Sequence, residues 1–290
     1  MLMIICIILN KISAYMQVIV SQENHTLSLR CMLALQDIGK GLKSFRIWLQ
    51  LAWQDIRLRY RRSALGPFWI TLSMGITIGL TGLLYGTLFR MHLHNYFPFF
   101  AAGMLTWGFI AISLTEGSNI YFEGENFLKQ MKLPFSAFIL RTVSRNFIIF
   151  LHNIVIFIPI ILIFHINVNF YTLISLYGVS LLLLNIIFIS TLLAIFGTRF
   201  RDIGQVVTSL IQVAFFLTPI IWSPAILPEK YQFAIYLNPF AQFLEMVRNP
   251  LIGMPPSTYA IVSTFILTII NATLAFIVFA RFRARIAYWL

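Results

Sequence analysis

YTLISLYGVSLLLLNIIFISTLLAIF, residues 171–196, contains no charged side chain. An α-helix rises about 1.5 Å per residue, so about 20 apolar residues cross the roughly 30 Å hydrocarbon core of a bilayer, and this segment is long enough to do so. Strands of a membrane barrel would alternate apolar and polar residues, whereas this segment is continuously apolar. It therefore predicts a transmembrane helix, and similar apolar runs occur elsewhere in the chain.

Five further apolar runs lie on either side of it, at about residues 67–89, 97–118, 146–166, 206–222 and 258–280. Hydrophobic residues make up 59% of the 290 residues and charged residues only 10%, which excludes an ordinary water-soluble domain. We therefore expect an all-α integral membrane protein with six transmembrane helices, which form a membrane domain over residues 67–290.

The basic residues lie between the apolar runs and indicate which side of the membrane each end faces. The N-terminal region, residues 119–145, residues 197–205 and the C-terminus together hold 18 of the 21 Lys and Arg residues, against three in the other connections. Cytoplasmic loops carry the excess of Lys and Arg, so both termini are predicted to be cytoplasmic. The formal net charge of +12 then reflects membrane topology, and no nucleic-acid partner is expected.

Residues 1–35 form an N-terminal extension whose role is open. The first twenty residues are apolar but are broken by Asn10 and Lys11, and they lack a basic leading region and a small-residue cleavage site, which disfavours a signal peptide. Two interpretations stay open. Translation could start at Met32, which we slightly prefer, or the extension could be a peripheral anchor.

Residues 36–66 are predicted to be a cytoplasmic segment at the membrane interface. Within it, FRIWLQLAWQDIRLRYRR (45–62) combines Trp48, Leu51 and Leu58 with a cluster of four arginines. Such an amphipathic helix lies at the level of the lipid headgroups, and its guanidinium groups face phosphates or a partner protein. The alternative is a simple topogenic anchor. The arginines are Arg57, Arg59, Arg61 and Arg62.

The first apolar run carries glycines at spacings of three and four residues. Small residues at this spacing allow another helix backbone to approach closely, so these positions predict helix packing and no chemistry. The residues are Gly75, Gly79, Gly82 and Gly86.

NIYFEGENFLKQMKLPFSAFILRTVSR, residues 119–145, is predicted to be a cytoplasmic loop with a short mixed-charge helix that ends at Pro134. Charged side chains there surround apolar ones, as expected of a docking element for a soluble partner. An ordinary solvated connection is the alternative. The candidate docking residues are Glu123, Glu125, Phe127, Lys129 and Lys132.

Residues 218–257, between the fifth and sixth runs, hold seven of the eleven prolines. The apolar pieces between these prolines are too short to cross a bilayer. They predict short broken or re-entrant helices on the external side, where protein or water must satisfy their backbone groups.

The sequence offers no catalytic constellation. It has no paired carboxylates, no metal-ligand cluster and no nucleophile beside a base, and GKGLKS (39–44) lacks the spacing of a phosphate-binding loop. None of the acidic residues lies at the middle of an apolar run, which argues against an ion-coupled carrier, and an acidic cluster suited to a membrane glycosyltransferase is missing. His152, within the third run, is expected to be a packing residue. We therefore predict a chain that is not an enzyme and binds neither metal nor cofactor.

Several segments, taken in their order along the chain, resemble the permease subunits of ABC transporters that export cell-surface polysaccharides. The joint spacing of these segments is more specific than any one of them. They are RYRRSALGPFW (59–69), AAGMLTWGF (101–109), LTEGSNIYFEGENFLKQMKLP (114–134), RNFIIFLHN (145–153), FGTRFRDIGQ (196–205), TPIIWSP (218–224) and LNPFAQFLEMVRNPLIG (237–253).

The resemblance implies a homodimer in the bacterial inner membrane that joins a dimer of ATP-binding subunits and exports an isoprenoid-linked polysaccharide. The partner subunits would use ATP and Mg. The amphipathic helix and the loop around Glu123 would contact those subunits, and the proline-rich region would gate the exit. The candidate gate residues are Trp222, Pro224, Tyr231, Tyr236 and Phe240.

The resemblance identifies the exported polysaccharide less directly. O-antigen is our first expectation, with capsule and teichoic acid as alternatives. We also expect the arginine cluster before the first run to attract the pyrophosphate of the lipid-linked glycan, because guanidinium groups suit phosphate oxygens.

Overall fold

The structure is a computed structural model, and it describes residues 27–59, 61, 66, 68–130 and 133–290. Within these residues the regular elements are all helical. Five helical segments are long and apolar enough to cross a membrane. They are α4 (Phe68–Leu88), α5 (Leu93–Gly117), the segment Phe135–Ile163, α10 (Phe170–Arg199) and α14 (Thr258–Trp289).

The fifth predicted run gives a shorter helix than expected. Helix α11 (Ile203–Leu217) has 15 residues, which corresponds to a length of about 22 Å and is less than a bilayer core requires. It ends because Pro219 restricts the residue before it to extended backbone, and Thr218 accordingly has φ −93° and ψ 135°. Residues 218–222 continue without regular structure of more than a turn.

The third segment starts earlier than the uncharged run suggested. Helix α8 (Phe135–Ile154) includes residues 135–145, which we had expected in the cytoplasmic loop, because the helix continues through two arginines. A break then separates α8 from α9 (Phe157–Ile163). Pro159 explains the break, since its ring excludes a regular helical bond to the carbonyl of Val155.

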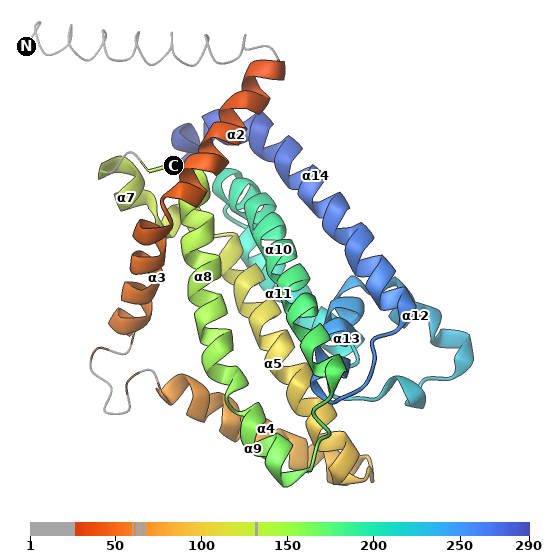
Figure 1. Cartoon of the computed structure of the whole chain (residues 1–290). Helices are drawn as coiled ribbons and strands as arrows, with labels where there is room; N and C mark the ends of the chain where they lie inside the picture. Colours follow the sequence, from red (N-terminus) through yellow and green to blue (C-terminus); the bar gives the residue numbers. More distant parts are fainter. Residues whose placement is uncertain (1–26, 60, 62–65, 67, 131–132) are drawn as a thin grey trace, which may run out of the picture.

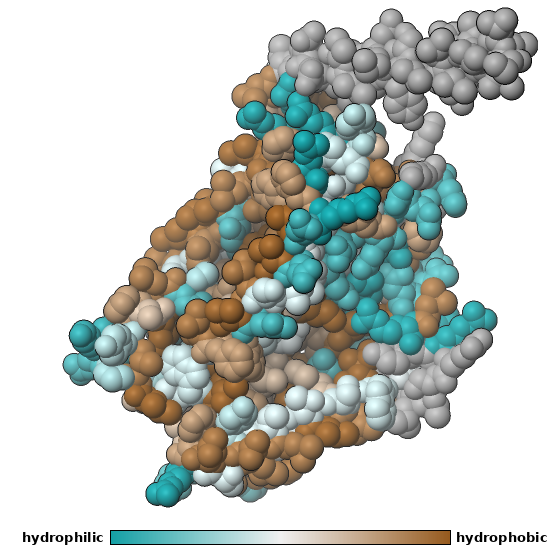
Figure 2. All heavy atoms as spheres, turned by 180° about the vertical axis from the view of Figure 1, so that it is seen from behind, coloured by the Kyte–Doolittle hydropathy of each residue, from teal (hydrophilic) through white to brown (hydrophobic). Residues whose placement is uncertain are grey.

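Helices α5, α8 and α10 run side by side through the middle of the molecule, and α14 lies against α10 (Figure 1). Helix α4 packs against α5 and crosses the lower ends of the central helices obliquely. Helix α5 is the most buried of the long segments, whereas α4 and α14 expose most of their apolar side chains. Figure 2 shows the resulting apolar surface, with polar side chains gathered toward the side where α3 and α7 lie.

The N-terminal part of the described chain forms two helices, α2 (Leu27–Lys43) and α3 (Phe45–Arg59). Helix α2 begins before residue 36, so the expected division between residues 35 and 36 falls inside a helix. Helix α3 packs along α8, and α2 packs against α8 and α14. The predicted amphipathic segment thus has one face against the bundle.

The connections at the two ends of the bundle differ. At the end near α3, two short helices, α6 (Ile120–Glu123) and α7 (Glu125–Gln130), precede α8. At the other end, α11 is followed by the 3₁₀ turns η1 (Pro224–Ile226) and η2 (Glu229–Tyr231) and by two helices, α12 (Phe233–Leu237) and α13 (Pro239–Leu251). Helix α13 is largely buried against α5, α10 and α14.

Candidate functional site

Two arginines on one face of α8 pair with a carboxylate from α3. Arg141 and Arg145 are four residues apart, so both side chains point the same way. Nε and Nη2 of Arg141 donate to the two carboxylate oxygens of Asp55 over 2.8 and 2.6 Å. This bidentate geometry is the strongest arrangement of an arginine with a carboxylate, and it fixes α3 to α8.

Arg145 connects two further segments, α5 and α6, to the same site and contacts Asp55 of α3 as well. Its Nη2 donates to Oε2 of Glu116, at the end of α5, over 2.6 Å. Its Nη1 lies 3.5 Å from Asp55 Oδ2 and 3.8 Å from Oε2 of Glu123 on α6. The other Glu116 oxygen accepts from Arg59 Nη2 over 3.2 Å. We call Asp55, Arg59, Glu116, Glu123, Arg141 and Arg145 the charge junction.

The charge junction contains three arginines and three carboxylates, so its formal charges balance. Only 8% of the Arg145 side chain and 19% of the Glu116 side chain are exposed. Charges removed from water in this way depend on one another, because loss of one partner leaves the other buried and uncompensated. The charge junction therefore couples α3, α5, α6 and α8 into one unit.

The short helices α6 and α7 join this unit through aromatic contacts as well. The guanidinium of Arg141 lies 4.9 Å from the ring centroid of Phe127, and that of Arg201 lies 5.8 Å from the ring of Phe122. Burial raises the pKa of the Glu123 carboxyl above its ordinary value, and nearby Arg145 acts in the opposite direction. The predicted docking element is thus directly connected to the bundle.

A second polar contact holds α2 on the bundle. Asp37, which is only 2% exposed, accepts hydrogen bonds from the backbone amides of Phe135 and Ser136 at the start of α8, over 3.3 and 3.0 Å. Its carboxylate also pairs with Nε of Arg283 on α14 at 2.7 Å. Asp37 therefore caps α8 from a different helix and neutralises Arg283. Burial also raises the pKa of the neighbouring Tyr121 hydroxyl well above its ordinary value.

Comparison with known proteins identifies the family. Residues 47–252 match the ABC-2 type transporter membrane domain. The chain belongs to the ABC-2 type transporter family. It is therefore a membrane permease subunit and not an enzyme, as its sequence indicated, and permeases of this family pair with ATP-binding subunits.

Three curated relatives share a printed name. The permease is 24% identical over 226 residues to an O-antigen export system permease protein RfbA of Klebsiella pneumoniae, covering 75% of this chain and 86% of that protein. A second Klebsiella pneumoniae RfbA is 26% identical over 196 residues, covering 66% and 74%. The RfbA of Myxococcus xanthus is 25% identical over 222 residues, covering 73% and 78%. The resemblance to polysaccharide-export permeases is thereby confirmed at the level of the family.

The predicted docking residues of the permease are only partly brought together. Glu123 and Phe127 contact the arginines of α8, and Glu125 begins α7. Lys129 lies in α7, and Lys132 lies outside the described residues.

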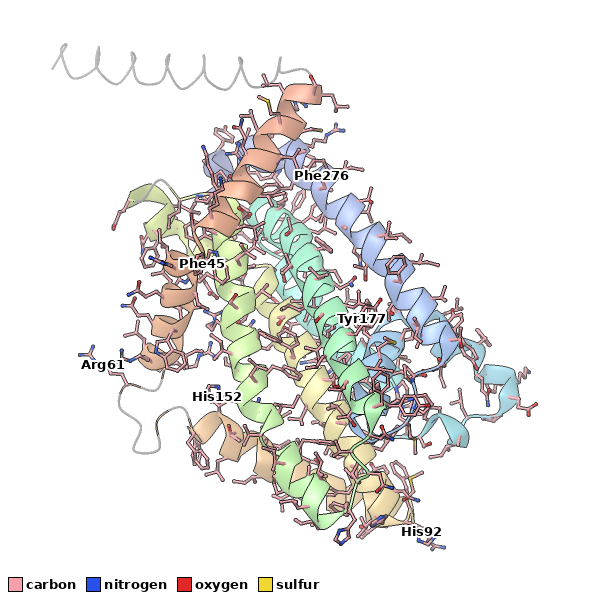
Figure 3. The ribbon with its side chains drawn as sticks, viewed as in Figure 1. Phe45, Arg61, His92, His152, Tyr177 and Phe276 are labelled. Carbon is pink, nitrogen blue, oxygen red and sulfur yellow. The ribbon has the colours of Figure 1, made fainter. Side chains whose placement is uncertain are left out.

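The structure places the arginines of the predicted cluster in different surroundings. Arg59 is held by Glu116, whereas Arg57 and Arg61 are exposed, and Arg61 projects away from the helices (Figure 3). Arg62 lies outside the described residues. His152, also labelled in Figure 3, has its Nδ1 2.9 Å from the carbonyl of Ile148, which is consistent with a packing role.

The glycines of α4 serve helix packing unequally. Side chains of α5 lie directly over Gly82 and Gly86: a Cβ atom at Gly86 would collide with Leu93, and one at Gly82 would make a tight contact with Phe97. Gly75 meets only Ile156 at ordinary contact distance, and Gly79 faces open space among the described residues.

The predicted gate residues of the permease do not form one cluster. Phe240 packs edge-on against Trp107 of α5, and Tyr236 packs edge-on against Tyr259 of α14. Trp222 donates from Nε1 to the carbonyl of Phe216, and Tyr231 is exposed. Pro224 begins the turn η1.

Sequence reasoning missed most of the charge junction. Asp55 and Glu116 were noted only as acidic residues away from the middle of a run, and the two arginines of α8 were assigned to a loop. The available signal was the spacing of Arg141 and Arg145, which places them on one helical face. In the described part of the chain, no three His, Cys, Asp or Glu side chains are grouped so that they could hold a metal ion.

Proposed function

We propose that this permease is the membrane-spanning subunit of an ATP-driven exporter of lipid-linked polysaccharide, with O-antigen as the first candidate cargo. Membership of the ABC-2 type transporter family supports the transport role. The printed names of the relatives from Klebsiella pneumoniae and Myxococcus xanthus support the class of cargo.

In this proposal the permease crosses the bacterial inner membrane six times, with both termini in the cytoplasm. Residues 36–66 are the interface segment and residues 67–290 the membrane domain. The fifth crossing in chain order combines α11 with residues 218–222, and α14 is the sixth. Irregular backbone is tolerated at membrane depth where protein satisfies it, and side chains do donate to the carbonyls of Pro219 and Ile221. Helices α12 and α13 then re-enter from the external side.

The charge junction carries the proposed mechanism. Two copies of the permease would join two ATP-binding subunits, which use ATP and Mg. These subunits would contact α3 and the short helices α6 and α7. The charge junction ties these elements to α5 and α8, so closure of the ATP-binding dimer would move the membrane helices as a unit and not merely bend a loop.

The cargo would approach from the cytoplasmic side. Arg57 and Arg61 are exposed near the start of α4, and together with Arg62 they are proposed to attract the pyrophosphate of the lipid-linked glycan. Trp222, Pro224, Tyr231, Tyr236 and Phe240 remain the proposed gate residues on the external side. Replacing the three arginines with Gln should trap lipid-linked polymer inside the cell, and normal surface polymer in a stably inserted variant would rule the role out.

Deletion of the gene tests the function itself. Surface lipopolysaccharide and the internal pool of lipid-linked glycan are analysed by gel electrophoresis in the deletion strain and in a strain complemented with the wild-type gene. Loss of surface O-antigen with accumulation inside, both reversed by complementation, is the expected result. Accumulation of a capsule or teichoic-acid precursor would keep the export role and change the cargo. An unchanged surface with no internal pool of any glycan would refute the proposal.

A further inference from the structure

A buried arginine lies at the opposite end of the permease from the charge junction. Arg248 on α13 is only 3% exposed. Its Nη1 donates to the carbonyl of Pro219 over 2.6 Å, and its guanidinium lies 3.8 Å from the ring centroid of Phe99 on α5. It thus joins α13 to α5 and to the segment that follows α11.

The surroundings of Arg248 are unusual for a buried cation. Among the described residues, its Nε has no hydrogen-bond partner. Glu245, one turn earlier, instead accepts from the amide of Ser257 over 2.8 Å. A buried charge is unfavourable, so the bond to Pro219 and the contact with Phe99 add to the attraction of the nearby Glu245 carboxylate in compensating it.

The segment bound by Arg248 depends on side chains to satisfy its backbone. We call residues 218–222 the exit strip. Besides the bond from Arg248 to Pro219, the hydroxyl of Tyr96 donates to the carbonyl of Ile221 over 2.7 Å. Asn238 Nδ2 donates to Thr218 Oγ1 over 3.0 Å. The amide of Thr218 donates to Ala214 of α11, but among the described residues the carbonyls of Pro219 and Ile221 accept only from side chains of other elements, so this part of the exit strip can detach without unwinding a helix.

The exit strip also packs against α5. Ile220 is fully buried, and its backbone and side chain lie beside Gly103, where a Cβ atom would be 3.6 Å away from Ile220. Tyr96 and Phe99, which hold the strip and Arg248, belong to the same helix. About 25 Å further along α5, Glu116 is part of the charge junction. One helix therefore contacts both sites.

We propose that Arg248 is a positioning residue that latches the exit strip closed against α5 and α13, and that release of this latch accompanies opening of the external exit. The inference rests on the proposed function, because it assigns the external end of the permease as the exit. It adds the element that moves, residues 218–222, and the side chain that holds it.

The test measures access to the exit strip from outside. Cys6 and Cys31 are replaced by Ser, and Ile220→Cys is introduced in the full-length permease, expressed together with its ATP-binding subunit. Spheroplasts depleted of ATP are treated with a membrane-impermeant maleimide. Arg248→Met, Arg248→Lys and Phe99→Leu are compared in this background. Ile226→Cys, at an exposed position of η1, is the matched control for labelling outside the latch.

We expect slow labelling of Cys at position 220 with Arg248 present. Arg248→Met should raise the labelling rate about tenfold, because a hydrogen bond from a charged group is lost. Arg248→Lys should restore much of the protection, and Phe99→Leu should give a smaller rise than Arg248→Met. Labelling at position 226 should stay unchanged.

Equal labelling at position 220 with Arg248 and with Met would overturn the latch. A rise that Lys does not reduce, or one that occurs equally at position 226, would also overturn it, because either result indicates general loosening of the fold. If Arg248→Met fails to accumulate in the membrane, Phe99→Leu decides alone. These readouts do not depend on the cargo, so failure of the deletion experiment and failure of the latch can be told apart.

Discussion

The two ends of the permease use arginine in opposite ways. In the charge junction, Arg145 meets carboxylates from three other helices, whereas Arg248 meets a backbone carbonyl and an aromatic ring. The first arrangement depends most on its buried members, and it resists separation of the helices. The second holds one short segment through a few contacts. An exporter that is driven from one side requires a rigid junction where the ATP-binding subunits act. It also requires a contact that can be released where the cargo would leave.

Breaking the charge junction at its centre should have the largest effect. Arg145→Met leaves Glu116 buried without its closest partner, and we expect a loss of about 3–5 kcal/mol in stability together with loss of export. Thermal unfolding of the purified complex and surface polymer measure the two effects. Arg59→Gln is the matched control. It removes the more exposed partner of the same carboxylate and should cost about 1 kcal/mol or less. Equal losses for both variants would contradict the central role of Arg145.

Breaking the ion pair between α3 and α8 should have the second-largest effect on stability. A double-mutant cycle with Asp55→Asn and Arg141→Gln should give a coupling energy of about 1–3 kcal/mol, because the two bidentate hydrogen bonds are lost together. Thermal unfolding of the four proteins supplies the values. Additive effects would show that α3 is held by its apolar contacts and not by this pair.

Substitution of the aromatic partner of each arginine should destabilise the two ends of the permease to different extents. Phe99→Leu should cost about 1–2 kcal/mol, since the ring compensates a buried guanidinium, whereas Phe127→Leu should cost about 0.5–1 kcal/mol, because Arg141 keeps its carboxylate. Comparison of the two melting temperatures checks the order. The reverse order would mean that Arg248 does not depend on its ring.

The smallest expected effect concerns pH. The pKa of Glu123 is raised in the folded protein, so its charged form is disfavoured there and costs stability above that pKa. As the pH falls through the raised pKa toward the ordinary value, this cost disappears. Wild type should therefore gain stability relative to Glu123→Gln between neutral and mildly acidic pH. The difference between their melting temperatures measures it, and a change in the opposite direction would show that the ion pair with Arg145 dominates.

The membrane helices were largely predictable from the sequence, because a continuous apolar run needs no knowledge of its neighbours. Prediction failed where a charge or a proline falls inside or beside a helix. Arg141 and Arg145 ended the uncharged run although α8 had begun at Phe135, and Pro219 shortened the fifth helix. The arginines are accommodated by contacts that are distant in sequence, whereas Pro219 acts locally on Thr218.

The sites were less predictable for the same reason. Asp55 and Arg141 are 86 residues apart in the chain, and Arg145 and Glu116 are 29 apart. Which charges pair is decided by helix packing, and hydropathy does not encode it. The gate residues were predicted within the proline-rich region from the family resemblance, whereas the side chains that hold the exit strip include Arg248, Tyr96 and Asn238.

The cap that Asp37 provides has a consequence for biosynthesis. This carboxylate lies near the start of the described chain, its amide partners come about 100 residues later, and Arg283 is 246 residues away. A ribosome adds residues in order, so the α8 partners of Asp37 are synthesised first. Arg283 is synthesised only when nearly the whole polypeptide is complete. Completion of this contact therefore marks the arrival of α14, and in a chain that stalls before α14 the carboxylate has its α8 partners but lacks its arginine.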